Sequence, residues 1–444
     1  MIHFKEGYYA DVRIEDKFTT NIVIKNGALE EQKVISLKKA FIRVFDGTMW
    51  YYASTSDTDH IQEELDTLYG YATENPAIGE HPIVKRYEVN RDEKIVFADD
   101  CVKDIPVSDK QASIAALCAA CKSEHLQLVM GRYLDRYSRF WFYSSKGSEI
   151  TYDYQTTGLS IGLGFACGEE QFSDALQRAG VRYSDVRVTK EELADFISEC
   201  ETYITTAKPV VPGSYPVILA PMATGVFAHE SFGHKSEADF MLGDETMAKE
   251  WQIGKKVGSD ILTIYETGTI QGCGYTPYDD EGTKAGMTYL IKEGRLAGRL
   301  HSATTAAYLD EGLTGNARAV NCDFEPIVRM TNTIVKGGSS TVEELIAGIE
   351  HGYYIKDVKH GSGMSTFTIA PNLAYEIENG KIGKPVKIAV LTGNVFETLG
   401  LIDGVANDET VLCFVTGGCG KMEQSPLPVG LGGPHIRVSK MNVS

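Results

Sequence analysis

Apolar and polar residues alternate along the beginning of the chain. Between positions 8 and 54 the alternation is interrupted by Asn26-Gly27 and Asp46-Gly47, dipeptides that favour the tight turns of β-hairpins. This pattern predicts a meander of antiparallel strands. Apolar residues recur with helical spacing in three later segments, near residues 59–72, 109–122 and 189–206. The first half of the chain is therefore expected to form an antiparallel sheet covered by helices.

A break in the pattern follows the last of these helices. Residues 207–213 read Ala-Lys-Pro-Val-Val-Pro-Gly, and two prolines and a glycine directly after a helix are typical of a linker. We therefore divide the chain into an N-terminal α/β domain of residues 1–206 and a C-terminal domain of residues 207–444.

The second half carries mostly strand signals. Hairpin dipeptides return at Glu293-Gly294 and Asn379-Gly380. Two helices are expected among the strands, one near residues 225–240 and one near residues 342–351, which begins with a capping box of Thr341 and Glu344. The fold class is then α+β, with a C-terminal β-rich domain of curved antiparallel sheet that carries the helix near residues 225–240.

The composition limits the classes of function. A chain of 444 residues with 43% apolar content can fill two hydrophobic cores. Its formal net charge of −18, without a run of Lys and Arg, disfavours direct binding to nucleic acid. Nine scattered cysteines, an odd number in a chain too long to need disulfides, favour a reducing compartment. The N-terminus is polar and no stretch approaches the ~20 apolar residues of a membrane span, so we expect a cytoplasmic protein without membrane association.

One segment carries residues that could form a hydrolytic metal site. Residues 226–234 read Val-Phe-Ala-His-Glu-Ser-Phe-Gly-His, so His229 and His234 flank Glu230 at an unusual spacing. On a regular helix, residues i and i+5 point about 140° apart, which is too far to share one ion. A π-bulge, or unwinding at Gly233, would bring the two imidazoles together. The alternative is that His229 is a helix histidine with satisfied hydrogen bonds and that His234 caps the helix end.

A third ligand would have to come from elsewhere in the chain. Cys419 lies in a glycine-dense tail, between Gly418 and Gly420, where tight turns allow a loop to deliver a thiolate to another element. The simpler interpretation of a lone cysteine is a small apolar side chain at a turn. The residues alone leave both interpretations open.

The acidic run Asp279-Asp280-Glu281-Gly282 could also bind a metal such as calcium or magnesium. It lacks the alternating ligand spacing of a calcium loop. We therefore interpret it as a solvated turn between strands and assign it no metal.

Several motifs in one order resemble the TldD/PmbA family. They lie within residues 216–438 and read His229-Glu230-x-x-x-His234 with Glu237, Asp279-Asp280-Glu281-Gly282-Thr283, Thr314-Gly315-Asn316, Met330-Thr331-Asn332-Thr333, and Cys419-Gly420-Lys421-x-x-Gln424 with Pro428-Val429-Gly430. The resemblance implies a two-domain zinc metalloprotease that hydrolyses small peptides or unfolded polypeptides. By motif position it implies that His229, His234 and Cys419 bind Zn²⁺ and that Glu230 is the general base for the attacking water. Because all four residues are present, the chain resembles the TldD branch rather than the PmbA branch, which lacks the zinc motif.

The resemblance also bears on partners. It implies a homodimer or a heterodimer with a PmbA-like subunit, and a peptide or unfolded protein as substrate. Glu237 is a candidate hydrogen-bond partner for one of the imidazoles. The alternative function is a non-catalytic regulatory or binding subunit that zinc stabilises, acting as a modulator of a DNA enzyme or of a partner protease.

Overall fold

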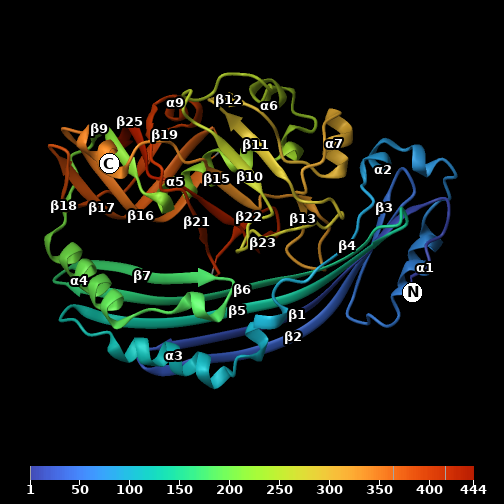
Figure 1. The fold of residues 1–444 in the computed structure, drawn as a ribbon, viewed down its shortest axis with the longest axis horizontal. Coiled ribbons are helices and arrows are strands. Elements are labelled where there is room, and N and C mark those ends of the chain that lie inside the picture. Colours follow the sequence, from blue (N-terminus) through green and yellow to red (C-terminus); the bar gives the residue numbers. More distant parts are fainter. Residues whose placement is uncertain (1, 364, 416) are drawn as a thin grey trace.

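The structure, a computed structural model, describes residues 2–363, 365–415 and 417–444. Its first half forms one long curved sheet, and its second half forms a β-rich body that lies over one face of that sheet (Figure 1). Helices α3 (Val107–Ala120) and α4 (Lys190–Thr206) lie on the opposite face. The architecture is therefore mixed α+β, and the two halves meet at the sheet.

The first sheet has seven strands in the order β3-β2-β1-β5-β6-β4, with β7 also paired to β6. The strands are β1 Tyr9–Lys25, β2 Ala28–Phe45, β3 Trp50–Thr55, β4 Arg91–Lys94, β5 Leu126–Ser144, β6 Glu149–Cys167 and β7 Glu170–Gly180. All pairs are antiparallel except β4 with β6. Asn26 and Gly27 form the turn between β1 and β2 with φ angles of 48° and 82°, as a type I′ hairpin requires. The predicted N-terminal antiparallel sheet is confirmed.

The helices predicted in the first half are present. They are α1 (Ile61–Tyr71), α3 and α4, together with a short α2 (Pro82–Arg86). Helix α4 begins at the predicted capping box, in which Glu192 N donates to Thr189 Oγ1 at 3.1 Å and Thr189 N donates to the Glu192 carboxylate at 2.8 Å. Helices α3 and α4 pack Ile114 and Ile197 into one apolar core with the strands. That core lies between the sheet and the two helices.

The second half contains two larger sheets. A six-stranded sheet has the order β12-β11-β10-β15-β24-β21, and an eight-stranded sheet has the order β16-β9-β25-β19-β17-β18-β8, with β20 paired to β25. Because β16 also pairs with β17, the strands β16, β9, β25, β19 and β17 close a small barrel. Two short hairpins, β13-β14 and β22-β23, complete the strands.

The elements of the second half have the following bounds. The strands are β8 Lys208–Pro209, β9 Gly213–Leu219, β10 Ile264–Thr267, β11 Met287–Lys292, β12 Arg295–Leu296, β13 Ala317–Arg318, β14 Ile327–Val328, β15 Asn332–Val335, β16 His351–Gly363, β17 Thr366–Glu378, β18 Lys381–Lys387, β19 Leu391–Asn394, β20 Ile402–Val405, β21 Thr410–Cys413, β22 Cys419–Lys421, β23 Gln424–Leu427, β24 Gly430–Gly433 and β25 Ile436–Val443. The helices are α5 Pro221–Ala228, α6 Glu245–Glu250, α7 Ala303–Leu309, α8 Val342–Ala347 and α9 Val395–Gly400.

The second half is β-rich as predicted but is not the purely antiparallel sheet expected of it. The pairs β15–β24, β9–β16 and β8–β18 are parallel. Parallel pairing needs long connections that return the chain to the same end of the sheet, and hairpin signals cannot reveal these. The two predicted hairpin turns are present, at Glu293-Gly294 between β11 and β12 and at Asn379-Gly380 between β17 and β18.

Buried ion pairs hold the second half against the first sheet. Arg13 of β1 lies 2.7 Å from Asp280, and Arg43 of β2 pairs with Asp11 at 2.9 Å and with Glu281 at 3.3 Å. The Arg43 and Glu281 side chains are only 4% and 3% exposed. The acidic run at residues 279–282 is therefore not the solvated turn that we predicted. It is a buried loop, because Asp280 and Glu281 pair with guanidinium groups from distant strands and Asp279 accepts from backbone N–H groups.

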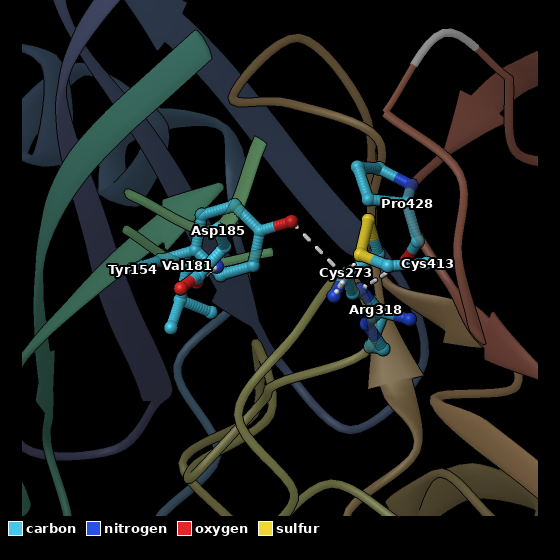
Figure 2. Close-up of a disulfide and its surroundings, with 7 residues drawn as sticks. All are labelled: Tyr154, Val181, Asp185, Cys273, Arg318, Cys413 and Pro428. Carbon is cyan, nitrogen blue, oxygen red and sulfur yellow. Dashed lines mark hydrogen bonds between the residues drawn. A yellow bond between two sulfur atoms is a disulfide. The ribbon is translucent and has the colours of Figure 1, made fainter. Parts of the chain in front are cut away.

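Cys273 and Cys413 form a disulfide across a sequence separation of 140 residues. Cys413 ends β21 and Cys273 follows β10, and both strands belong to the six-stranded sheet. Figure 2 shows the disulfide beside Tyr154 of β6, whose hydroxyl donates to Cys273 O at 3.1 Å. The expectation that the cysteines form no disulfide is thus corrected. The number and spacing of cysteines cannot show which strands become neighbours.

Two other expectations concern the chain as a whole. Among the helices that the structure describes, none is long and apolar enough to cross a membrane. Helix α4 ends at Thr206 and β8 begins at Lys208, on either side of the proposed boundary. The division at residue 207 and the cytoplasmic location stay predictions.

The buried pair of Lys110 and Asp135 gives a stability prediction. Lys110 Nζ lies 2.6 Å from Asp135 Oδ2, and both side chains are 0% exposed. Lys110→Met leaves Asp135 buried without its counter-charge, so we expect the free energy of unfolding to fall by about 3–5 kcal/mol. Lys5→Met is the control, because Lys5 and Asp66 are about half exposed and should lose no more than ~1 kcal/mol. Urea unfolding followed by tryptophan fluorescence measures both, and equal losses would contradict the prediction.

Candidate metal centre

The helix predicted near residues 225–240 is regular only in its first part, which is α5. After α5, His229–Gly233 form a π-helical turn and His234–Ser236 form a 3₁₀ turn. In a π turn residues i and i+5 become neighbours. The imidazole rings of His229 and His234 accordingly lie 5.1 Å apart, with an interplanar angle of 78°. The structure therefore uses the π-bulge, one of the two ways by which the sequence could bring these histidines together.

Two glycines allow this helix to lie close to its neighbours. A Cβ atom at Gly225 would be 2.3 Å from Leu431 Cδ1 and 2.7 Å from Gly432 N, both in β24. A Cβ atom at Gly233 would be 2.2 Å from Met330 Sδ. Any side chain at these two positions would collide with its neighbours. The π turn can therefore lie over the six-stranded sheet only because both residues are glycine.

Cys419 reaches the two imidazoles from the C-terminal tail. It begins β22, which forms a hairpin with β23. Its Sγ lies 3.4 Å from His234 Nε2, and the ligand atoms of His229, His234 and Cys419 all lie within 4.8 Å of one another. The buried guanidinium of Arg329 holds the hairpin in place, because it donates to Cys419 O at 2.8 Å and to Gln424 O at 3.0 Å.

A buried series of charges orients His234. His234 Nδ1 lies 3.2 Å from Glu237 Oε2, and Glu237 lies 3.1 Å from Lys421 Nζ. Lys421 also pairs with Asp239 at 2.7 Å. Because Nδ1 is held by Glu237, Nε2 is the nitrogen that faces Cys419. Glu237 is therefore the imidazole partner that the sequence suggested.

The same contacts set the protonation of the site. Burial raises the pKa of the Cys419 thiol, but hydrogen bonds with His229 and His234 outweigh it and lower that pKa to about 5. Burial lowers the pKa of His234, but hydrogen bonds with Cys419 and Glu237 raise it to about 10. The sulfur is therefore a thiolate at neutral pH, which is the form in which cysteine binds metals.

These residues fit a metal ion with nitrogen and sulfur ligands. His229 Nδ1 is buried and has no hydrogen-bond partner among the described residues. The 3.4 Å between Cys419 Sγ and His234 Nε2 is close to the ~3.5 Å that separates such atoms around tetrahedral zinc. Two imidazoles and a thiolate suit a softer ion than magnesium or calcium. The metal-binding roles of the three residues stay a prediction, and their convergence supports it.

A cleft of 660 Å³ adjoins this cluster. His229, Glu230 and Cys419 line part of it, and strands β5, β6 and β7 of the first sheet line another part. The volume lies in the range of small-molecule and cofactor sites. Glu230 lies against Gly361 of β16, where a Cβ atom would be 3.1 Å from Glu230 Cγ. Glu230 thus lines the cleft beside two residues of the cluster, His229 and Cys419.

The sequence did not reveal all of the polar residues at this site. Arg329 holds Cys419 in place, and Lys421 pairs with Glu237. Arg329 directly precedes the motif at residues 330–333, and Lys421 belongs to the motif that begins at Cys419. Their positions in the sequence could therefore have indicated a role at the site. Asp174 of β7, Asp357 of β16 and Asn372 of β17 also line the cleft. These three belong to no motif, and only the pairing of distant strands brings them together.

The family models match two parts of the chain. The C-terminal domain of the PmbA/TldA metallopeptidases matches residues 212–444, and domain 1 of the same metallopeptidases matches residues 10–69. A metalloprotease of Methanothermobacter thermautotrophicus is 32% identical, over 97% of this chain and 94% of its own length. A zinc metalloprotease TldD homolog of Saccharolobus solfataricus is 28% identical, over 98% of this chain and 96% of its own.

A solved structure is similar over nearly the whole chain. A proposed modulator of a DNA gyrase from Thermotoga maritima superposes with a TM-score of 0.78 at 18% identity. The superposition covers 99% of this chain and 96% of that protein. At this identity the likeness shows that the fold is shared.

Close packing at Gly225 gives a prediction for metal binding. In Gly225→Ala the new methyl group meets the backbone of β24, so α5 must shift and carry His229 away from Cys419. We expect Co²⁺ affinity, measured from thiolate charge-transfer absorption, to fall at least about tenfold, as for other changes that misplace a ligand. Gly70→Ala in α1 is the control, because a Cβ atom there meets no atom within 4 Å. Unchanged Co²⁺ affinity in Gly225→Ala would contradict the prediction.

The protonation of Asp174 gives a prediction for stability against pH. Burial, and then the charge of Asp357, raise the pKa of Asp174 from 3.8 to about 7, with a further contribution from Glu199 and an opposing one from Asn372. A carboxyl group with a raised pKa keeps its proton in the folded state while the unfolded chain has lost it. The free energy of unfolding therefore falls as pH rises between about 4 and 7.

Asp174→Asn removes this loss. We expect the variant to unfold at a higher urea concentration than the wild type at pH 8, and at the same concentration at pH 4, both measured without metal. Asp195→Asn on α4, an exposed position, should show no such dependence. If Asp174→Asn is not more stable than the wild type at pH 8, the carboxyl group is not held in an unfavourable environment.

Proposed function

This chain belongs to the PmbA/TldD metallopeptidase family and is a metalloprotease, and we propose that it is a zinc-dependent peptidase acting on small peptides or unfolded polypeptides. In this proposal His229, His234 and Cys419 hold the zinc ion and Glu230 is the general base. One observation carries it. The ligand atoms of two imidazoles and a thiolate lie within 4.8 Å of one another, and Glu230 lines the cleft beside them.

The donor set suits zinc. Zinc binds imidazole nitrogen and thiolate sulfur with tetrahedral geometry, and three protein ligands leave one position for chemistry. When bound, zinc supplies Lewis-acid catalysis by stabilising the negative charge that develops on oxygen. The similar zinc metalloprotease TldD homolog also supports this choice of metal.

The residues of the chain carry the proton transfers. The carboxylate of Glu230 takes a proton from the attacking water and returns it to the nitrogen of the leaving amine. Glu237 holds His234 Nδ1, so the imidazole keeps its tautomer and orientation through the reaction. Arg329 fixes the hairpin that presents Cys419. Two of the three proposed ligands, His234 and Cys419, are therefore each positioned by a second, buried group.

The shape of the site supports small or unfolded substrates. The cleft lies between the two halves of the chain, because its lining residues come from the first sheet and from the second half. A volume of 660 Å³ accommodates a short extended segment but not a folded domain. A substrate must therefore enter as a flexible chain.

We also propose that the protein works as a dimer, either with a second copy or with a PmbA-like subunit. The distal half of β2 exposes a group of large apolar side chains, namely Leu29, Val34, Ile35 and Leu37. Apolar side chains gathered on a solvent-facing strand are typical of protein interfaces. Either partner would cover this strand.

The proposed base is tested with Glu230→Gln, which keeps the size of the side chain but cannot accept a proton. Zinc-loaded wild type and variant, matched in zinc content, are incubated with a pool of unfolded peptides, and the products are identified by mass spectrometry. We expect the rate of cleavage to fall by about 10²–10⁴-fold in the variant. Glu245→Gln, at an exposed position in α6, should cleave at the wild-type rate.

Two outcomes would contradict the proposal in different ways. If Glu230→Gln cleaves as fast as the wild type, Glu230 is not the base. If the zinc-loaded wild type cleaves nothing, even with a PmbA-like partner added, the non-catalytic subunit stabilised by zinc becomes the better description.

A further inference from the structure

Two carboxylates in the cleft have no cationic partner among the described residues. Asp174 of β7 and Asp357 of β16 both line it, and neither forms an ion pair in the part of the chain that the structure describes. They are close enough that the charge of Asp357 raises the pKa of Asp174, after the larger effect of burial. Two adjacent carboxylates removed from water are unfavourable unless a positive group joins them.

An amide side chain from β17 lies beside Asp174, and its hydrogen bond lowers the pKa of that carboxyl group. Asn372 is 6% exposed and its Oδ1 atom is buried without a hydrogen-bond partner among the described residues. Oδ2 of Asp174 is unpartnered in the same way, while its Oδ1 accepts from Ala175 N at 2.7 Å. An unsatisfied buried acceptor costs about 1–3 kcal/mol in stability. The group that is missing here is therefore a donor.

The strand geometry explains why Asn372 points to this position. Leu373 pairs with Asp357 and Pro371 pairs with Val358, so Asn372 is an extra residue in β17 at a β-bulge. A bulge turns one side chain out of the regular alternation, and bulges are frequent beside functional sites. The bulge brings Asn372 and Asp357 to the same edge of the cleft.

The nearby lysines do not supply the missing charge. Lys356 is exposed and pairs with Glu199 of α4. Lys359 is also exposed and forms no ion pair among the described residues. The groups that act on Asp174 from β16, β17 and α4 are two carboxylates and an amide, and Lys359 and His360 of β16 line the same cleft. The position accepts hydrogen bonds, carries negative charge and opens to the cleft.

We propose that Asp174, Asp357 and Asn372 bind a primary ammonium group of the peptide substrate, either its free amino terminus or a lysine side chain. The inference rests on the proposed peptidase function, because the same cleft carries Glu230 and the metal cluster. An ammonium group donates three hydrogen bonds and brings one positive charge, which matches three acceptors and the unpaired carboxylates. A substrate fixed at this position presents a peptide bond at a set distance from Glu230.

Protons compete with this ligand. Because the pKa of Asp174 is raised to about 7, its carboxyl group carries a proton below that pH when no ammonium group is bound. Binding of the ammonium group displaces that proton. Peptide affinity should therefore fall as pH drops from 8 to 6.

The test measures binding rather than turnover. A zinc-loaded Glu230→Gln protein is titrated with a C-terminally labelled octapeptide, and fluorescence anisotropy gives the dissociation constant at pH 8. Four forms of the peptide are compared: free amino terminus without lysine, N-acetylated without lysine, N-acetylated with one lysine, and N-acetylated with one acetyl-lysine. We expect a form with an ammonium group to bind about tenfold or more tightly than its acetylated counterpart, and the first and third forms distinguish the two sources.

Three variants complete the design. Asp174→Asn should abolish the preference for an ammonium group, while the fully acetylated peptides bind as before. Asp357→Asn should reduce the same preference, and it tests the second carboxylate independently. Asp195→Asn, an equal change of charge at an exposed position, should keep the full preference.

Each other outcome overturns the inference. Equal binding of all four peptides, a preference that survives Asp174→Asn, or no binding of any peptide would each reject an ammonium site. Displacement of bound peptide by micromolar Ca²⁺ or Mg²⁺ would show that the carboxylates hold a metal ion instead. Cleavage of fully acetylated peptides by the wild type would leave the peptidase function standing after the ammonium site had failed.

Discussion

The chemistry of this protein depends on one constraint, that two imidazoles at positions i and i+5 must face the same point. A regular helix cannot meet it, because it separates those side chains by about 140°. The π turn at His229–Gly233 meets it by adding one residue to the turn. The glycines at positions 225 and 233 then allow β24 and Met330 to press against the helix. The two imidazoles of the metal cluster therefore lie together only because of this π turn.

The halves of the chain are coupled through buried charge. Arg13 and Arg43 reach from the first sheet to the acidic loop at residues 279–282, which places that sheet against the second half. The cleft exists because of this docking, since its walls come from both halves. Arg329 and the Cys273–Cys413 disulfide tie the C-terminal tail to the second half. A loss of docking would therefore open the cleft without removing any residue of the metal cluster.

The site contains two opposite electrostatic arrangements. Behind the metal cluster the charges are paired in series, from His234 to Glu237 to Lys421 to Asp239. Such buried charges are tolerated because each one is paired and hydrogen-bonded. Asp174 and Asp357 have no such partner in the described part of the chain, and burial raises the pKa of both. Stability is lower where a binding site keeps its charge free for a ligand.

The sequence by itself determined the local features of this protein. Alternating residues and the Asn26-Gly27 turn predicted the first hairpin, and Thr189 with Glu192 predicted the start of α4. The spacing of His229 and His234 even required a π turn or an unwound helix, because helical geometry follows from the chain alone. The motif order identified Cys419 as the third candidate ligand, although its role is not a local property.

Only the tertiary structure decided which distant segments meet. The parallel pairs of the second half, the disulfide and the burial of residues 279–282 all join strands that are far apart in the sequence. The same is true of Asp174, Asp357 and Asn372, which share one position because β7, β16 and β17 converge there. Hydrogen bonds within a turn or helix depend on neighbouring residues, so they can be predicted from a short stretch of sequence. The pairing of distant strands depends on the free energy of the whole fold, and no short stretch of sequence contains it.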